Sequence, residues 1–340
     1  MKNNRIFWAL LVLVILLNSA SSEFFTFEGE GLDTSSLLKS ASNRSHNNMD
    51  FLDLALYQGI KFASEEAKTN PGMPLYANIS NYSVIIPTNN DPADIYYPNT
   101  QDSRRSSERL PFALLLQGAN VDKSFYKGFA CTVASYGFVV VVPNHESNFI
   151  VESGLFAEEK ELNDILAFMI SENATSTSPL YGKIDTGTMM LLGHSYGGVA
   201  GLYAIEGTCQ PPFCFGLKFH RPASLKGGVF YGTNLKGPIG AIPELDNNGI
   251  PIALIQGSRD GLAIPADGKE TFHKIKNPPK AYVTIEGANH YGITDLNNPP
   301  GAKPDTNIPL ITQEDAVEAI GRWSALLLRA YIQGERNTSD

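Results

Sequence analysis

Short, wholly apolar runs alternate along the chain with longer segments in which apolar residues recur every three or four positions. The short runs predict strands over residues 82–86, 95–97, 112–117, 138–142, 189–192, 228–231, 252–256 and 281–285. The longer segments predict helices over residues 124–135, 156–171, 196–206, 266–276 and 313–333. Because strands that are apolar throughout are buried on both faces, the alternation predicts an α/β fold with a mostly parallel central sheet between two layers of helices.

The N-terminal pattern differs from the rest. Residues 1–22 combine a short basic start, an apolar run and small residues, which predicts a secretory signal peptide and a secreted or periplasmic protein with no membrane span after cleavage. An uncleaved N-terminal anchor is the alternative, although the apolar run is short for a span. Residues 23–48 are polar and predict a flexible segment. Residues 49–340 contain one core-forming pattern and predict a single domain.

One motif stands where strand and helix meet. The predicted strand over residues 189–192 leads directly into Gly193-His194-Ser195-Tyr196-Gly197, and the next predicted helix follows. A Gly-x-Ser-x-Gly sequence between a strand and a helix is typical of a sharp turn that lifts a serine hydroxyl above the sheet edge. The small residues allow strand and helix to approach closely. This context predicts that Ser195 is a nucleophile rather than part of a glycine-rich loop.

A serine hydroxyl becomes a good nucleophile only when a base removes its proton. Asp260 follows the predicted strand over residues 252–256, and His290 follows the strand over residues 281–285. Both residues therefore lie, like Ser195, just past the carboxyl ends of parallel strands, where functional groups gather in such sheets. The order serine, aspartate, histidine predicts a catalytic triad.

Each assignment has alternatives. Asp260 could be only a turn residue, since Asp-Gly favours tight turns. Glu286 or Asp267 could orient the histidine instead, but neither comes directly after a strand on the path from serine to histidine. His145 follows an earlier strand and is the alternative base. We favour His290.

Acyl transfer also needs two N–H groups that stabilise the developing oxyanion. Tyr196, the residue after the nucleophile, supplies one, and Ala119 in the loop after the strand over residues 112–117 supplies the other. Whether the Asn120 side chain contributes is left open. His145, Tyr196, Tyr231 and Tyr291 are candidate pocket walls, and any of them could instead be a packing residue.

These motifs resemble the α/β-hydrolase superfamily. Within it, the chain is similar to dienelactone hydrolases, chlorophyllases, platelet-activating-factor acetylhydrolases and cutinase-like polyester hydrolases. The likeness covers roughly residues 80–333 and is carried by residues 94–98, 114–120, 136–144, 193–198 and 287–291. It implies a serine esterase with an acyl-enzyme step and no cofactor. No carboxylate follows the strand over residues 228–231, which disfavours the chlorophyllase and acetylhydrolase branches and favours Asp260 as the acid.

Charge and cysteine content narrow the picture further. The formal net charge is −9, from 26 basic and 35 acidic residues, and no basic stripe occurs, so nucleic acids and anionic membranes are not expected partners. In an oxidising compartment, Cys209 and Cys214 are close enough in sequence for a small-loop disulfide, with Cys131 left over. No cysteine and histidine pair at metal-ligand spacing, so no metal site is predicted.

The expected substrate is an ester, and the sequence gives no signal for oligomeric state. Residues 232–249 are too few for a large helical lid, which favours short-acyl or accessible polymeric esters. The alternatives are a lipid esterase of the chlorophyllase or acetylhydrolase kind, a serine peptidase of the same fold and a non-catalytic binding protein. The last usually lacks a triad member, and the peptidases generally carry an extra domain or a large cap, which this sequence does not show.

Overall fold

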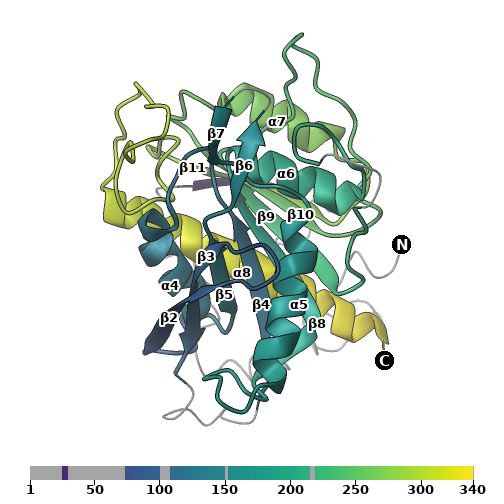
Figure 1. The fold of residues 1–340 in the computed structure, drawn as a ribbon. Helices are drawn as coiled ribbons and strands as arrows, with labels where there is room; N and C mark the ends of the chain where they lie inside the picture. Colours follow the sequence, from purple (N-terminus) through teal and green to yellow (C-terminus); the bar gives the residue numbers. More distant parts are fainter. Residues whose placement is uncertain (1–24, 30–72, 100–107, 150–151, 215–218, 340) are drawn as a thin grey trace, which may run out of the picture.

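The computed structural model describes residues 25–29, 73–99, 108–149, 152–214 and 219–339. This part of the chain contains a nine-stranded sheet in the order β1-β11-β10-β9-β8-β4-β5-β3-β2 (Figure 1). The six strands from β11 to β5 run parallel to their neighbours, whereas β1 at one edge and β3 and β2 at the other run antiparallel. The large, mostly parallel sheet confirms the predicted α/β class.

The strands of this sheet correspond closely to the apolar runs in the sequence. Their bounds are β1 Phe25–Gly29, β2 Ile79–Ile85, β3 Pro92–Pro98, β4 Leu110–Leu116, β5 Val139–Pro143, β8 Ile184–His194, β9 Leu225–Tyr231, β10 Ile252–Gly257 and β11 Lys280–Ile285. Side chains alternate between the two faces. In β4, Ala113 and Leu115 pack into one core, and Leu114 and Leu116 pack into the other. Burial on both faces explains why these strands are apolar throughout.

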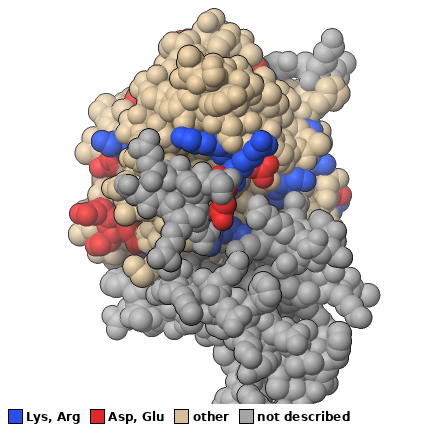
Figure 2. Space-filling model, turned by 90° about the horizontal axis from the view of Figure 1, so that it is seen from below, with Lys and Arg blue, Asp and Glu red and all other residues tan. Residues whose placement is uncertain are grey.

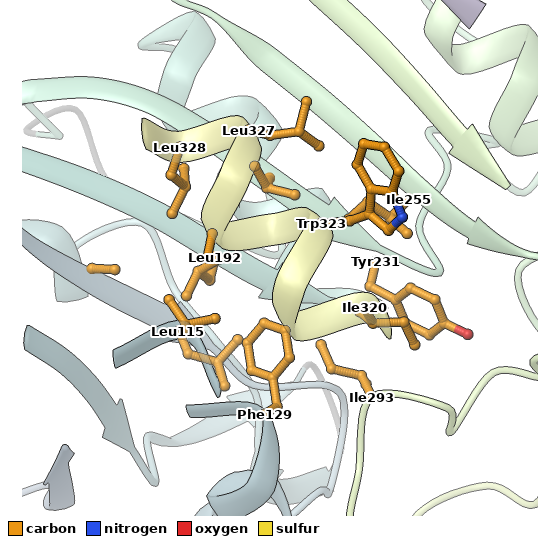
Figure 3. Packing of buried hydrophobic residues seen from close by; sticks show 14 of the residues in the cluster. Leu115, Phe129, Leu192, Tyr231, Ile255, Ile293, Ile320, Trp323, Leu327 and Leu328 are labelled. Atoms are coloured by element: carbon orange, nitrogen blue, oxygen red, sulfur yellow. The ribbon is translucent and has the colours of Figure 1, made fainter. Parts of the chain in front are cut away.

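Helices cover both faces of the sheet. α4 (Lys127–Ser135), preceded by a short 3-10 turn, η3 (Lys123–Tyr126), packs on one face with α8 (Gln313–Ser339). α5 (Glu161–Ala174), α6 (Tyr196–Glu206) and α7 (Pro265–Lys274) place their buried residues in the other core. Figure 3 shows how Ile320, Trp323 and Leu327 of α8 face Leu192 and Ile255 of the sheet.

Three strands were not predicted. β1 lies in the segment expected to be flexible, and for Phe25–Gly29 that prediction is wrong, because these residues pair with the otherwise open edge of β11. β6 (Glu146–Phe149) and β7 (Glu152–Leu155) form a separate antiparallel pair after β5. The predicted signal peptide and the remainder of the flexible segment lie outside the described residues.

The predicted disulfide between Cys209 and Cys214 is present, and Cys131 is a free, half-buried thiol. In the described ranges, no helix is both long and apolar enough to cross a bilayer. Figure 2 shows one face of the molecule, on which Lys and Arg side chains lie beside Asp and Glu side chains.

Candidate active site

Ser195 occupies a strained turn between β8 and α6. Its φ of 52° and ψ of −118° are rarely adopted by residues other than glycine. A Cβ atom on Gly197 would lie 2.2 Å from the carbonyl oxygen of Leu116, so only glycine allows this approach of α6 to β4. The Ser195 N–H donates to the Tyr231 carbonyl of β9 at 3.0 Å, which fixes the turn at the carboxyl end of the sheet. The local geometry therefore agrees with the predicted strand, sharp turn and helix.

His290 and Asp260 meet beyond the carboxyl ends of β10 and β11, as the sequence predicted. The Nδ1 atom of His290 lies 2.9 Å from Oδ2 and 3.0 Å from Oδ1 of Asp260. Both residues are 2% exposed. A carboxylate can only accept here, so Nδ1 carries a hydrogen and Nε2 is the nitrogen left to act as a base.

The Asp260 carboxylate is held by its own turn. Oδ1 accepts hydrogen bonds from the N–H groups of Leu262 and Ala263, at 2.9 and 2.8 Å. Oδ2 accepts from Nε2 of Gln256 at 3.0 Å. Three donors in addition to His290 compensate the buried negative charge and fix the orientation of the carboxylate.

The alternative acids do not contact His290. Asp267 forms an ion pair with Lys236 at 2.9 Å, and Glu286 is exposed. Of the three candidate carboxylates, Asp260 is the one bonded to the imidazole.

A second aspartate, Asp305, supports this arrangement and was not identified from the sequence. Its Oδ2 atom accepts from the His290 N–H at 3.0 Å and from the Gly261 N–H at 3.1 Å, so it connects the two loops that carry the pair. Asn289 is fully buried and donates to Asn297 and to the Asn307 carbonyl, which fastens the histidine loop to the segment that follows. Asp305 lies 15 residues after His290 in a Pro- and Asn-rich loop, and no local pattern singles it out.

His194 lies beneath the site and connects its parts. Its Nε2 atom is 3.0 Å from the His290 carbonyl oxygen, so Nε2 must carry the hydrogen. Burial, followed by the electrostatic effect of the nearby His290, holds the pKa of His194 well below 6.5, and the ring of His194 is therefore neutral. Its Nδ1 atom then accepts from the Tyr126 hydroxyl at 2.9 Å, and that hydroxyl accepts from the Gly118 N–H at 2.9 Å. A chain of hydrogen bonds thus joins the loop after β4 to the backbone of His290.

The predicted oxyanion donors belong to two segments, the loop after β4 for Ala119 and the start of α6 for Tyr196. In the loop after β4, the Gly118 N–H donates to the Tyr126 hydroxyl, and the Asn120 N–H donates to the Leu155 carbonyl. The Ala119 N–H, which lies between them in sequence, has no acceptor among the described residues. Tyr196 is the first residue of α6, so its N–H is at the positive end of the helix dipole. The Asn120 side-chain oxygen accepts from the Leu155 N–H at 3.0 Å, which ties this carboxamide to β7.

The candidate wall residues divide into two groups. Tyr196 and Asn120 are partly exposed, and the Tyr196 ring packs 4.7 Å from that of Phe213, inside the disulfide loop. Tyr231 and Tyr291 are buried, and their hydroxyls donate to the carbonyls of Asn289 and Lys303. These two tyrosines pack beneath the site in the core that α8 covers.

His145 is also buried and bonds to a different carboxylate. Its Nδ1 atom lies 2.7 Å from Oδ2 of Asp91, and its backbone carbonyl accepts from Nε2 of Gln117 at 3.0 Å. In the described part of the chain, Asp91, His145 and Glu161 form a buried group with a spacing that could hold a metal ion. This histidine is therefore not bonded to Asp260.

No protein-family model matches this sequence, and no curated protein matches it either.

Proposed function

We propose that this protein is a serine carboxylic-ester hydrolase with an α/β-hydrolase fold, in which Ser195, His290 and Asp260 form a catalytic triad. The observation that carries the proposal is the buried Asp260–His290 pair at the carboxyl ends of the parallel strands, where the strained Ser195 turn also lies. The succession of serine, aspartate and histidine after three parallel strands supports the same arrangement.

In the acylation half of the proposed reaction, the Ser195 hydroxyl attacks the ester carbonyl carbon while Nε2 of His290 takes the hydroxyl proton. Asp260 stabilises the resulting imidazolium through Nδ1. The negative charge on the carbonyl oxygen is stabilised by the N–H groups of Ala119 and Tyr196. When the intermediate collapses, the bond to the leaving alcohol breaks and His290 donates its proton to the alcohol oxygen. The acyl group remains on Ser195.

Deacylation repeats these steps with water. His290 takes a proton from a water molecule, whose oxygen attacks the acyl carbon. The second tetrahedral intermediate uses the same oxyanion donors. Its collapse breaks the bond to the Ser195 oxygen, which regains the proton from His290, and the carboxylic acid leaves. These steps use no cofactor.

The proposed substrates are short-acyl or accessible polymeric esters. Residues 232–251, between β9 and β10, contain no helix in the described structure, so this segment supplies no helical lid. Tyr196, the residue after the proposed nucleophile, and Phe213, whose ring is 4.7 Å from that of Tyr196, are partly exposed and offer apolar surface to an acyl group.

The direct test is hydrolysis of p-nitrophenyl acetate by wild type, Ser195→Ala and Ser258→Ala. Ser258 is a matched control because it follows β10 at the same sheet edge, and its hydroxyl oxygen accepts from the Gly287 N–H. We expect Ser195→Ala to lose on the order of a thousandfold or more in kcat, with an unchanged circular dichroism spectrum. Near-normal turnover by Ser195→Ala would refute the proposal. Faster cleavage of peptide p-nitroanilides than of esters by wild type would favour a peptidase.

A further inference from the structure

The carboxylate cluster around His145 has a composition that the proposed hydrolysis does not explain. Asp91, Glu158 and Glu161 surround one imidazole, and Asp91, His145 and Glu161 are each at least 95% buried. Potential ligand atoms of these three residues lie within 4.8 Å of one another. Lys160 contacts Glu158, which leaves two carboxylates, Asp91 and Glu161, for one imidazole, and uncompensated negative charge is costly in a buried setting.

The two nitrogens of His145 have different surroundings. Nδ1 lies 2.7 Å from Asp91, so it carries a hydrogen and donates it to the carboxylate. Nε2 is buried and has no hydrogen-bond partner. It faces Oε2 of Glu158 at 3.7 Å. A metal-binding histidine usually donates the N–H of one ring nitrogen to a carboxylate that does not bind the metal, and its other ring nitrogen binds the ion.

Glu161 supplies the second unpartnered atom. Its Oε1 atom accepts from the Glu158 N–H at 2.8 Å, whereas Oε2 is buried with no partner. The fully buried side chain belongs to the first turn of α5, next to Glu158. Two buried atoms with lone pairs, one nitrogen and one oxygen, are therefore left unsatisfied in the same cluster, which is rare without a bound group.

We propose that His145, Glu158 and Glu161 form a binding site for a divalent transition-metal ion of the zinc type, with Asp91 as the outer residue that orients the imidazole. Two ligand atoms that are each about 2 Å from a tetrahedral zinc ion lie about 3.4 Å apart, close to the 3.7 Å between His145 and Glu158. Lys160, which contacts Oε2 of Glu158 at 3.0 Å, has a largely exposed side chain and can move into solvent.

The chemistry of the ligands favours zinc over calcium or magnesium. An imidazole nitrogen with two carboxylates suits zinc, which binds three protein ligands and keeps a fourth position for water or another donor. Calcium takes six to eight oxygen ligands and magnesium prefers oxygen in an octahedral arrangement. We expect the bound ion to stabilise the neighbouring loop that carries Ala119. The His145 carbonyl accepts a hydrogen bond from Nε2 of Gln117, two residues before Ala119.

The alternative to a metal ion in this cluster is a proton bound by His145 or Glu161. Burial opposes charge on His145, but Glu161 and then Asp91 outweigh this effect and raise the pKa of His145 to about 10. Burial raises the pKa of Glu161 to about 7. A protonated cluster without metal is therefore the alternative that the experiment must separate from a metal site.

The experiment uses full-length protein stripped with EDTA, reloaded with ZnCl2 and passed through a desalting column, with zinc per chain measured by elemental analysis. We expect one zinc ion per wild-type chain and a rise in Tm of about 5 °C at zinc concentrations near 100 times Kd. Glu161→Gln and His145→Gln should weaken zinc binding by at least about tenfold. CaCl2 in place of ZnCl2 should leave the Tm unchanged.

Glu159→Gln is the matched control. Glu159 is also buried, and its Oε2 atom also has no partner among the described residues, but its carboxylate contacts the Gln210 N–H, and Glu206 adds to the effect of burial in raising its pKa. It should bind zinc as wild type does. Absence of stoichiometric zinc from wild type, or equal zinc binding by Glu161→Gln and wild type, would overturn the proposal and leave a cluster that holds only a proton. Loading the stripped wild-type protein with Co²⁺ in place of zinc gives a readout that needs no variant. A tetrahedral Co²⁺ ion with nitrogen and oxygen ligands absorbs visible light, and this absorption is measured.

Discussion

Within the described residues, two buried aspartate–histidine pairs occur, and their imidazoles have different neighbours. In the first, His290 lies 2.9 Å from Asp260, and in the second, His145 lies 2.7 Å from Asp91. Both histidines follow a strand of the central sheet at its carboxyl end. In both, the aspartate fixes Nδ1 and leaves Nε2 as the nitrogen that can act.

The surroundings decide what each Nε2 atom can do. Asp260 accepts three further hydrogen bonds, and no other acid is bonded to the His290 ring in the described structure. Nε2 of His145 instead lies 3.7 Å from Oε2 of Glu158 and has no hydrogen-bond partner among the described residues. An aspartate–histidine pair is therefore not by itself a sign of catalysis. His290 has one carboxylate partner, whereas His145 has Asp91 at Nδ1 and Glu158 near Nε2, and this difference favours the proposed cation site at His145.

The largest expected difference between the pairs is the effect of removing each aspartate charge. Asp260→Asn should lower kcat on p-nitrophenyl acetate by about 10⁴-fold, because an amide favours the wrong tautomer of His290. Asp91→Asn should change kcat by less than about tenfold, because His145 takes no proton in the reaction.

Two variants serve as controls for the loss of a carboxylate elsewhere. Asp267→Asn removes an ion pair with Lys236, and Glu286→Gln changes an exposed side chain, so both should stay active. An active Asp260→Asn beside an inactive Glu286→Gln would show that the acid is wrongly assigned.

A smaller effect is expected from His194, which joins the first pair to the loop that carries Ala119. His194→Phe preserves ring volume but removes the hydrogen bonds to Tyr126 and to the His290 carbonyl. Misplacement by about 1 Å can reduce a rate on the order of a hundredfold, so we expect a 10- to 100-fold loss in kcat with KM nearly constant. A rise in KM at constant kcat would indicate that His194 acts only on substrate binding.

The smallest effect concerns stability in acid. Since burial holds the pKa of folded His194 well below its unfolded value of 6.5, the unfolded state binds more protons as the pH falls. The stability that depends on neutral His194 is present above pH 6.5 and is lost as the pH decreases below it. Urea unfolding at pH 7.5 and 5.5 should therefore show a smaller acid effect for His194→Phe than for wild type. An equal effect in both proteins would assign acid sensitivity to other groups.

The sequence predicted what local patterns encode. Apolar runs located the parallel strands, and the Gly-x-Ser-x-Gly motif located the Ser195 turn. Asp260 and His290 could be paired because each directly follows a strand and parallel strands end at one edge. The edge strand β1 could not be predicted, since five residues in a polar segment carry little pattern, and their pairing depends on the open edge of β11.

Long-range contacts explain the remaining omissions. Tyr126 and His194 are 68 residues apart and each alone resembles an ordinary core residue. Asp91 and His145 are separated by 54 residues, and a search for metal-ligand spacing within a short stretch could not bring them together. Only the folded structure places Glu158 and Glu161 beside this histidine.

The central claim, that Nε2 of His290 rather than of His145 activates Ser195, is tested most directly by the rate of labelling with a fluorophosphonate probe. Wild type, His290→Gln and His145→Gln are labelled side by side, and the modified residue is located by mass spectrometry. We expect labelling of wild type on Ser195, a labelling rate lower by on the order of a thousandfold or more in His290→Gln, and a rate within about tenfold of wild type in His145→Gln. Rapid labelling of His290→Gln, or modification of a different residue in wild type, would contradict the central claim.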